Sequence, residues 1–371
     1  MRINHGMIYN GDFCLEAKDL ILEDGKIKAI LKPGAPYTKQ QDILNARDLK
    51  ILPGLIDIHI HGSRGADTMD GTPEALQTVS RHLASQGVTA FLPTTMTTPI
   101  AELEQAFNNH PVLDGAQALG FNMEGPFISP KKRGAHLESC IRKPTAAEFS
   151  DYLNRAKIKV VTIAPEMPGA LDFISRFGDQ VVCSIGHTTA DYDTAMEAIR
   201  RGARSLTHTF NAMPPLLHRD PGVIGAAVKS GIYGELIADG VHIHPAVVYC
   251  AYRLFGDDRL ILISDAMRAA GLPDGHYELG GQPVLVNHGV ARTEDGTIAG
   301  GTSNVWIGLK NAVNFGIPES SAVKMVTRNP ARLIGEYDHK GSIEEGKDAD
   351  LILLRDDLTL EHVIIGGKRY E

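Results

Sequence analysis

Cysteine, tryptophan and long apolar runs are all scarce in this sequence. Its 371 residues include four cysteines and one tryptophan, and no two cysteines form a C-x-x-C pair. This spacing disfavours a disulfide framework or a zinc ribbon, and it fits a reducing cytoplasm. No stretch reaches the ~20 consecutive apolar residues of a membrane helix. The first residues lack an apolar core followed by small residues, so we expect neither a signal peptide nor a membrane partner.

Positive charge is also in short supply. The chain has 37 Lys+Arg and 45 Asp+Glu, which gives a formal net charge of −8 at pH 7. An acidic chain repels phosphate backbones, so we expect no nucleic-acid partner, although a local basic pocket for a small anion stays possible. Hydrophobic residues make up 43% of the chain, which is enough for a core and argues against general disorder. The length favours one large barrel with an appendage, or two domains.

Both ends of the chain have the pattern of short strands and turns. Two apolar runs between Leu20 and Ile30 flank Asp24-Gly25, which is a strong hairpin signal. Near the other end, apolar residues from Ile343 to Leu354 surround a turn-rich segment, and another apolar run precedes Gly366-Gly367. We expect residues 1–52 and 336–371 to form one small β-sandwich domain, with the termini close together.

The middle of the chain alternates strand-like runs with helical segments. The eight strand-like runs are Leu55–His61, Thr89–Thr94, Ala118–Glu124, Lys159–Ala164, Val181–His187, Ser205–His208, Gly234–Asp239 and Leu260–Asp265. The helical segments include Pro73–Gln86, Ile100–His110, Thr145–Ala156, Ala190–Arg201, Pro245–Phe255, Ser303–Phe315 and Glu319–Thr327. This α/β alternation predicts a (β/α)8 TIM-like barrel over residues 53–335, with a β insertion near 276–298. A doubly wound open sheet is the rival architecture.

Imidazole and carboxylate side chains stand where six of the eight predicted strands end. The residues are His59 and His61, Glu124, His187, His208, Asp239 with His242, and Asp265. Catalytic groups of a barrel lie at the carboxyl ends of its strands, so this placement predicts an active site.

His59 and His61 are two residues apart on one strand, so their side chains face the same side. Two imidazoles in a barrel mouth suit a borderline metal such as Zn²⁺ or Fe²⁺, although two core histidines would give the same spacing. Glu124 follows an apolar strand and is either a metal ligand or the ion-pair partner of Lys131, Lys132 or Arg133.

His187 and His208 complete a His/His/carboxylate set with Glu124. Asp265 ends a fully apolar strand, where a carboxylate is a metal ligand, a general base or the cap of the next helix. A bound metal lowers the pKa of water, and a nearby carboxylate can then take the proton.

These motifs, in this order, resemble the amidohydrolase superfamily and, within it, the N-acetylglucosamine-6-phosphate deacetylase family. The matching stretches are Pro53 to Gly62, Asn122 to Phe127, Gly186-His187-Thr188, Thr207 to Pro214, Asp239 to His242, and Ser264-Asp265-Ala266. The first stretch is shared by many amidohydrolases, whereas Met-Glu-Gly-Pro and His-Thr-Phe-Asn-Ala-Met are more specific. The resemblance covers essentially the whole chain, including the split β domain.

The resemblance implies a role for each matching residue. Glu124, His187 and His208 would bind the principal metal, Asp265 would be the general base and then the acid toward the leaving amine, and His242 would hold or polarise the acetyl carbonyl. The residues implied in substrate binding are Ala135, His136, Asn211, Ala212, Arg219, Asp239, His242, Ile298, Ala299 and Gly300. The implied reaction is metal-dependent hydrolysis of N-acetyl-D-glucosamine 6-phosphate to glucosamine 6-phosphate and acetate. A homodimer is implied too, with Arg219 beside the neighbouring subunit's site.

Several alternatives stay open at this stage. Because both His59 and His61 are present, the sequence leans toward two ions, with Glu124 bridging and Asp265 also available, but zinc and iron are not distinguished. The substrate alternatives are another N-acetylhexosamine 6-phosphate, such as the galactosamine epimer, and the cyclic amides or amines of other amidohydrolases. The non-enzymatic alternative is a scaffold protein that has the barrel fold but no catalytic activity. For Arg219, the alternative to phosphate binding is a solvated charge on a loop.

Overall fold

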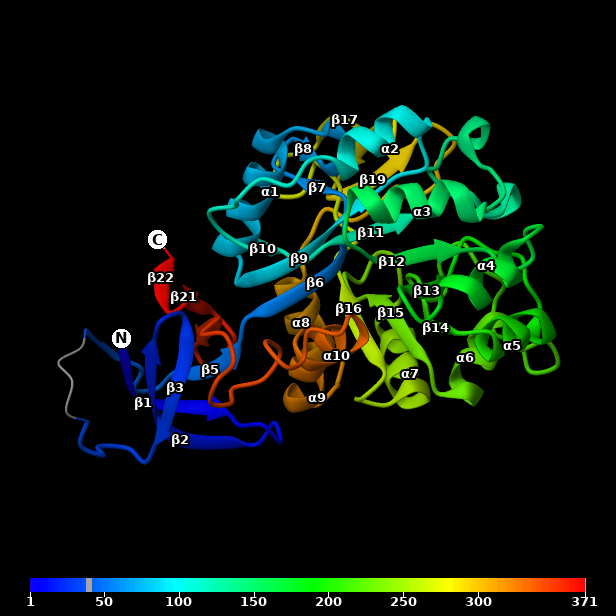
Figure 1. Cartoon of the computed structure of the whole chain (residues 1–371). Helices are drawn as coiled ribbons and strands as arrows, with labels where there is room; N and C mark the ends of the chain where they lie inside the picture. The colour runs from blue at the N-terminus through cyan, green and yellow to red at the C-terminus, as the bar shows by residue number, and fades with distance from the viewer. Residues whose placement is uncertain (38–41, 371) are drawn as a thin grey trace.

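The computed structural model describes residues 1–37 and 42–370. Eight parallel strands form its centre: β6 (Leu55–Ile60), β9 (Val88–Thr95), β11 (Phe121–Glu124), β12 (Ile158–Ile163), β13 (Val182–Ile185), β14 (Ala203–Leu206), β15 (Tyr233–Ile237) and β16 (Leu260–Ile263). They pair in chain order, with β6 on β9 and β9 on β11 (Figure 1). All eight predicted runs are therefore strands of one sheet.

The sheet closes between its last strand and its first. A parallel bridge joins Ile60 to Ala266, and the Asp265 N–H donates to the His59 carbonyl oxygen at 2.9 Å. The Ser264 hydroxyl donates to the buried Asp57 carboxylate at 2.5 Å across the same junction between β16 and β6, which we call the seam. The barrel prediction is confirmed, and the open-sheet rival is wrong. Closure also places the ends of β6 and β16, which carry His59 and Asp265, next to each other.

The third predicted run is broken in the structure. Its first residues form the short strand β10 (Gln117–Ala118), which pairs with β9, and the run resumes as β11 after Gly120. Gly120 has φ +140, and a Cβ there would lie 2.5 Å from the Lys157 carbonyl oxygen. Only glycine can lie so close to the Lys157 backbone with this φ angle, so the chain turns at Gly120 before it continues as β11.

Helices pack around the outside of the barrel. They are α1 (Pro73–Ser85), α2 (Ile100–Phe107), α3 (Ala146–Arg155), α4 (Ala170–Phe177), α5 (Tyr192–Arg200), α6 (Gly222–Ser230), α7 (Pro245–Phe255), α8 (Val305–Asn314), α9 (Glu319–Val326) and α10 (Arg328–Leu333). Three short helices, α4, α6 and α10, were not among the predicted helical segments. Apolar faces hold the helices together: Phe173 and Phe177 of α4 lie 4.8 and 4.9 Å, centroid to centroid, from Phe149 of α3.

Strands from both ends of the chain form a second sheet. They are β1 (Arg2–Tyr9), β2 (Leu15–Glu23), β3 (Lys26–Leu31), β4 (Ile43–Asn45), β5 (Lys50–Pro53), β20 (Leu351–Leu354), β21 (Leu360–Ile365) and β22 (Lys368–Tyr370). The ends join where Leu351 pairs with Pro53, and both termini lie at this sheet (Figure 1). The predicted hairpin at Asp24-Gly25 joins β2 to β3. A domain division at residues 52/53 and 335/336 stays our proposal.

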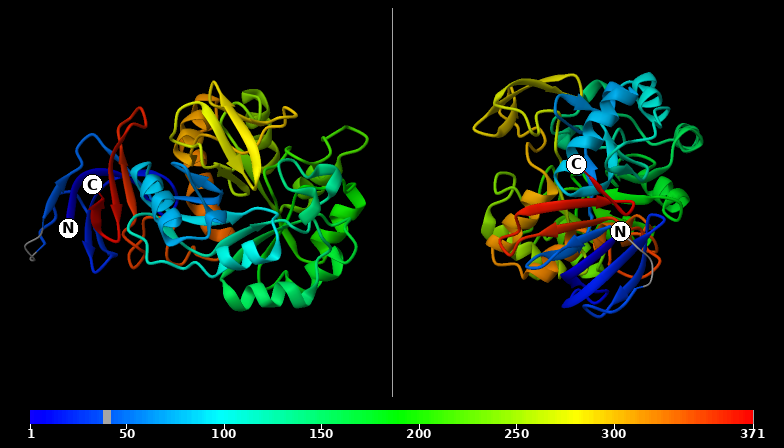
Figure 2. Two further views of the ribbon diagram at one scale, coloured as in Figure 1. Left: turned by 90° about the horizontal axis from the view of Figure 1, so that it is seen from above. Right: turned by 90° about the vertical axis from the view of Figure 1, so that its left-hand side faces the viewer.

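The predicted insertion is a three-stranded antiparallel sheet. Its strands are β17 (Gly275–Leu279), β18 (Gln282–Asn287) and β19 (Val290–Thr293). Figure 2 shows it in yellow, projecting from the barrel and standing clear of the end sheet. Among the described residues, no helix is long and apolar enough to cross a membrane.

The hydrogen bond between Ser264 and Asp57 at the seam leads to a prediction about stability. Replacing Ser264 with alanine leaves the fully buried Asp57 without its hydroxyl donor, so we expect a loss of about 1–3 kcal/mol of unfolding free energy. Denaturant titration would measure it. Ser175→Ala, on the exposed face of α4, is the control and should change stability by less than about 0.5 kcal/mol. Equal effects of the two changes would show that the seam is not a special point of the fold.

Candidate metal centre and active site

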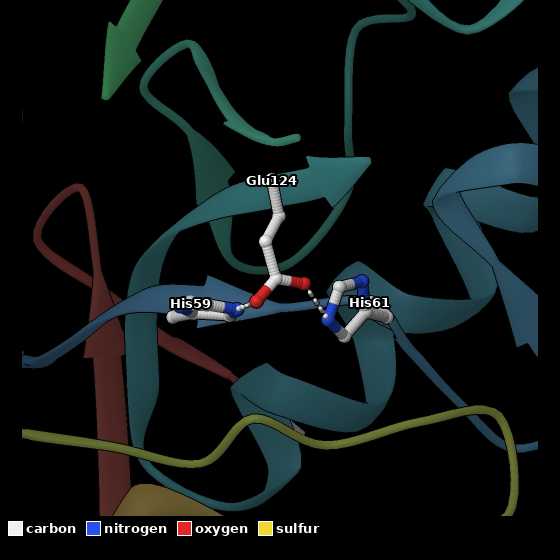
Figure 3. Close-up of side chains that lie close together, drawn as sticks. All are labelled: His59, His61 and Glu124. Atoms are coloured by element: carbon white, nitrogen blue, oxygen red, sulfur yellow. Dashed lines mark ion pairs between the residues drawn. The ribbon is translucent and has the colours of Figure 1, made fainter. Parts of the chain in front are cut away.

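One carboxylate lies at the centre of the barrel mouth. Glu124 ends β11, is 3% exposed, and lies within 3.5 Å of five imidazole Nε2 atoms. These nitrogens belong to His59 (3.5 Å), His61 (3.2 Å), His136 (3.3 Å), His187 (3.0 Å) and His208 (2.9 Å). Figure 3 shows that the two carboxylate oxygens face His59 and His61 separately. No lysine or arginine of the described residues pairs with Glu124, so the predicted alternative of an ion pair with Lys131, Lys132 or Arg133 does not hold.

The first group of candidate ligands is Glu124 with His187 and His208. Both Nε2 atoms lie beside Glu124 Oε1, and they are 3.0 Å from each other. Burial lowers the pKa of His187 to about 4, so its ring is neutral. His187 Nδ1 lies 2.7 Å from the Lys132 carbonyl oxygen, which can only accept, so the proton is on Nδ1.

This tautomer leaves a bare lone pair on His187 Nε2, facing a carboxylate oxygen at 3.0 Å. Two acceptors at that distance repel each other unless a cation lies with them. Imidazole and carboxylate are ligands that zinc and iron accept. The residues therefore fit a divalent metal ion.

The second group is His59, His61 and Glu124, with Asp265 alongside. The ligand atoms of the first three lie within 4.8 Å of one another. Asp265 Oδ1 lies 3.4 Å from His59 Nε2 and 3.2 Å from His61 Nε2. Burial works against charge on Asp265, but the hydrogen bond from His61 and the charges of His59 and His61 outweigh it and lower the pKa to about 2. Asp265 is therefore ionised at neutral pH and can accept a proton.

His136 is bound to the same carboxylate in a different way. Its Nδ1 accepts a hydrogen bond from the Thr97 N–H at 3.1 Å, so its proton is on Nε2, which faces Glu124 Oε2 at 3.3 Å. A protonated Nε2 has no lone pair for a metal. Although His136 lies in a geometrically possible ligand set with Glu124 and His187, its tautomer makes it a proton donor to Glu124.

The backbone is strained where these side chains leave their strands. His187, His208 and Asp265 have φ angles of +45, +28 and +48, in the left-handed region. Such conformations cost about 1–3 kcal/mol for a residue other than glycine. They aim the three side chains inward immediately after the strands end, so the strain is consistent with a functional requirement.

His242 faces the same space and is held by a neighbouring carboxylate. Its Nδ1 lies 2.7 Å from Asp239 Oδ2, and its backbone N–H donates to Asp239 Oδ1 at 2.9 Å. Burial works against charge on Asp239, but the hydrogen bond and charge of His242 lower its pKa below the usual range. Because Nδ1 is engaged with Asp239, Nε2 is the nitrogen left for a ligand.

A cavity of about 480 Å³ opens above the imidazole cluster. Predicted site residues that line it are His61, Glu124, Ala135, His136, His187, His208, Asn211, Ala212, His242, Asp265, Ile298 and Gly300. Leu279, Asp295 and Thr297 also line it, so the β insertion forms part of the wall. The structure thus answers a question that the sequence left open, namely whether the insertion reaches the site.

Three predicted substrate residues do not line this cavity. Asp239 is engaged with His242, the Ala299 N–H is bonded to the Ala291 carbonyl oxygen at 3.1 Å, and Arg219 is exposed with its guanidinium against His218. Their contact with substrate stays a prediction.

Other residues of the site were missing from our sequence prediction. Lys131, Lys132 and Arg133 line the cavity, and their adjacency to Ala135 and His136 was the available signal. Glu235, inside the barrel beneath His59, is a buried carboxylate in an apolar strand, the same signal that identified Glu124 and Asp265.

Comparison with known proteins identifies the class. Residues 51–370 match the amidohydrolase family. The chain is 40% identical to the N-acetylglucosamine-6-phosphate deacetylase of Bacillus subtilis, over 93% of this chain and 91% of that one. It is also 36% identical to the N-acetylgalactosamine-6-phosphate deacetylase of Escherichia coli O157:H7, over 95% of each chain. The chain therefore belongs to the amidohydrolase family.

Solved structures agree with this assignment. The crystal structure of N-acetylglucosamine-6-phosphate deacetylase from Pasteurella multocida is similar with a TM-score of 0.93 and 30% identity, covering 100% of this chain and 99% of that one. A mutant of the Mycobacterium smegmatis deacetylase, in complex with N-acetyl-D-glucosamine-6-phosphate, is similar with a TM-score of 0.91 and 32% identity, over 100% and 98% of the two chains.

The group of histidines around Glu124 leads to a prediction about metal removal. A chelator should lower the melting temperature, because a bound cation stabilises the folded state by about 2.7 kcal/mol at 100 times its dissociation constant. Thermal melts with and without chelator, followed by Zn²⁺ addition, would measure this. Glu124→Gln, which loses the shared charge, should show little response to either treatment. An unchanged wild-type melt would contradict a metal at this site.

Proposed function

We propose that this chain hydrolyses the N-acetyl amide of N-acetyl-D-glucosamine 6-phosphate to glucosamine 6-phosphate and acetate, as a step of amino-sugar catabolism. The observation that carries the proposal is Asp265, an ionised carboxylate 3.2 Å from His61 at the floor of a cavity of about 480 Å³. The deacetylase relatives, which match almost the full chain, supply the substrate class.

Asp265 is the proton carrier in this proposal. A bound divalent cation lowers the pKa of water and polarises a carbonyl oxygen. Asp265 accepts the proton that water loses as its oxygen adds to the acetyl carbon. It then passes that proton to the sugar nitrogen as the C–N bond breaks, because an unprotonated amine is a poor leaving group.

The remaining cavity residues position the substrate. His242, held at Nδ1 by Asp239, presents Nε2 to the acetyl carbonyl oxygen and, when protonated there, stabilises the negative charge that develops on it. Asn211 and the Ala212 backbone form one side of the cavity, and Ala135, His136, Ile298 and Gly300 form other parts of its wall. We assign the sugar and its phosphate to these residues.

The metal set has two parts in this proposal. Glu124, His187 and His208 hold one ion, while His59 and His61, with Glu124 and Asp265, hold a second. Zinc and iron both suit imidazole and carboxylate ligands. Direct counting of metal in purified protein would give the number and the identity of the ions.

We also propose that the chain acts in the cytoplasm as a homodimer, and the position of Arg219 supports the dimer. It is exposed and does not line its own cavity. Leu217 and Val241 are 51% and 42% exposed, and they lie on the loop of Arg219 and the loop of His242. Exposed apolar side chains such as these can be buried against a second copy of the chain. In this arrangement Arg219 reaches the partner's cavity, where a guanidinium can bind two phosphate oxygens at once.

A related substrate is the second candidate. The similarity to the N-acetylgalactosamine-6-phosphate deacetylase of Escherichia coli favours a test of the 4-epimer beside the glucosamine derivative.

Acetate release from N-acetylglucosamine 6-phosphate by purified, metal-containing protein is the decisive test. We expect release that a chelator abolishes, and faster release than from the 4-epimer. Asp265→Asn should keep the ion assigned to Glu124, His187 and His208 but lose about 10²- to 10⁴-fold in kcat, because the proton carrier is gone. Wild-type turnover by this variant would remove Asp265 from the mechanism. No release by metal-containing wild-type protein would move the substrate to another amide.

Arg219 gives a separate prediction. Arg219→Ala should raise KM for the phosphorylated sugar by about 10- to 100-fold, because it removes hydrogen bonds to a charged group. KM for unphosphorylated N-acetylglucosamine should change little, and Arg200→Ala, on the exposed side of α5, should affect neither value.

Mixed subunits test the homodimer. A heterodimer of Arg219→Ala and Asp265→Asn chains has one complete site only if Arg219 acts on its partner. Recovered activity on mixing would therefore support the trans arrangement, and its absence, with the heterodimer formed, would contradict it.

A further inference from the structure

We propose that Glu235 is a positioning residue for the second metal ion, because it fixes the tautomer and the orientation of His59. This inference rests on the proposed function only in taking His59 as a ligand. Glu235 lies in β15 and His59 in β6, so the contact spans the interior of the barrel and 176 residues of sequence. Both side chains are 0% exposed.

The contact decides which nitrogen of His59 carries the proton. Glu235 Oε2 lies 3.0 Å from His59 Nδ1. A carboxylate oxygen accepts a hydrogen bond, so this contact keeps a proton on His59 Nδ1 and leaves Nε2 as the nitrogen whose lone pair would bind a metal. That Nε2 is buried, lacks a hydrogen-bond partner in the described part of the chain, and lies 3.5 Å from Glu124 and 3.4 Å from Asp265. The lone pair is thus directed at the two carboxylates with which a metal ion would be shared.

The surroundings of Glu235 support this role over a purely structural one. Among the described residues, its carboxylate has no lysine or arginine partner, and its second oxygen, Oε1, has no hydrogen-bond partner. A buried carboxylate with so few partners is costly for a folded chain to keep. If His59 Nε2 held a metal ion, the charge of that ion would strengthen the N–H that His59 donates to Glu235 and so offset the cost.

His61 provides an internal contrast. Among the described residues its buried Nδ1 has no hydrogen-bond partner, and the carboxylates that it meets, Glu124 and Asp265, lie at Nε2 instead. Glu235 Oε2 additionally accepts the His208 backbone N–H at 3.2 Å, which links the two groups of candidate ligands through one side chain. His208 keeps its place without that bond, since the next residue, Thr209, donates its N–H to the Glu235 backbone oxygen at 2.8 Å.

The test measures metal retention by the full-length chain, independently of turnover. Wild type, Glu235→Gln and Glu235→Ala are loaded with Co²⁺ and dialysed against increasing chelator, and the ions per chain are counted at each step. We expect wild type to lose its ions in two stages. Glu235→Ala should lose the weaker ion at about 10- to 100-fold lower chelator concentration, as is typical for partners of metal-binding histidines. Glu235→Gln, whose amide oxygen can still accept from Nδ1, should fall between the two.

Controls separate this effect from loss of stability. Asp19→Asn removes another fully buried carboxylate, in the end sheet, and should leave both stages unchanged whatever its melting temperature. The nitrogen NMR shifts of the His59 ring should report one tautomer in wild type and a mixture in Glu235→Ala.

The results either support or overturn the proposal. Unchanged retention of the weaker ion in Glu235→Ala overturns it, as does an equal loss in Asp19→Asn. If Glu235→Ala does not fold, Glu235→Gln alone decides by the same criterion. A single stage in wild type also overturns it, while acetate release from the same sample would leave the proposed function standing.

Discussion

The Glu124 carboxylate is the constraint on which the rest of this structure depends. It is almost completely buried, and five imidazole rings surround it within 3.5 Å. A negative charge in such a place is stable only if positive charge lies beside it. The chain supplies imidazoles rather than lysine or arginine, and one of them, His187, faces Glu124 with a lone pair. Together these facts favour a metal ion as the counter-charge, and the barrel is arranged to hold the ligands of that ion.

The arrangement has two layers. Side chains at the strand ends point into the cavity, and a second set of polar groups fixes them from behind. Asp239 holds His242, the Lys132 carbonyl oxygen holds His187, and Glu235 holds His59. In each case the Nδ1 side of the ring is engaged and Nε2 is directed inward. His136 has the opposite tautomer, with its proton on Nε2, because the Thr97 backbone N–H donates to its Nδ1. The second layer thus fixes which nitrogen of each ring faces the cavity.

The insertion completes the site without contributing to the candidate ligand set. The insertion adds Leu279 and residues 295–298 to the cavity wall. Left-handed backbone at His187, His208 and Asp265 turns the chain sharply where each strand ends. The hydrogen bonds and the apolar core of the closed barrel hold both sides of each turn, and their stability offsets the strain energy. Arg219 does not line this cavity.

The sequence by itself determined the strand-helix alternation, the strand-and-turn pattern at each chain end and the polar residues at the strand ends. These are local features: a period of two or 3.6 residues, a turn-forming dipeptide, or a carboxylate after an apolar run. Tertiary structure alone decided that β16 closes on β6, that the third run breaks at Gly120, and that Glu235 contacts a histidine 176 residues away. It also decided that His187 presents a lone pair to Glu124 whereas His136 presents a proton. The tautomer of an imidazole depends on what meets its other nitrogen, and that partner comes from a distant part of the chain.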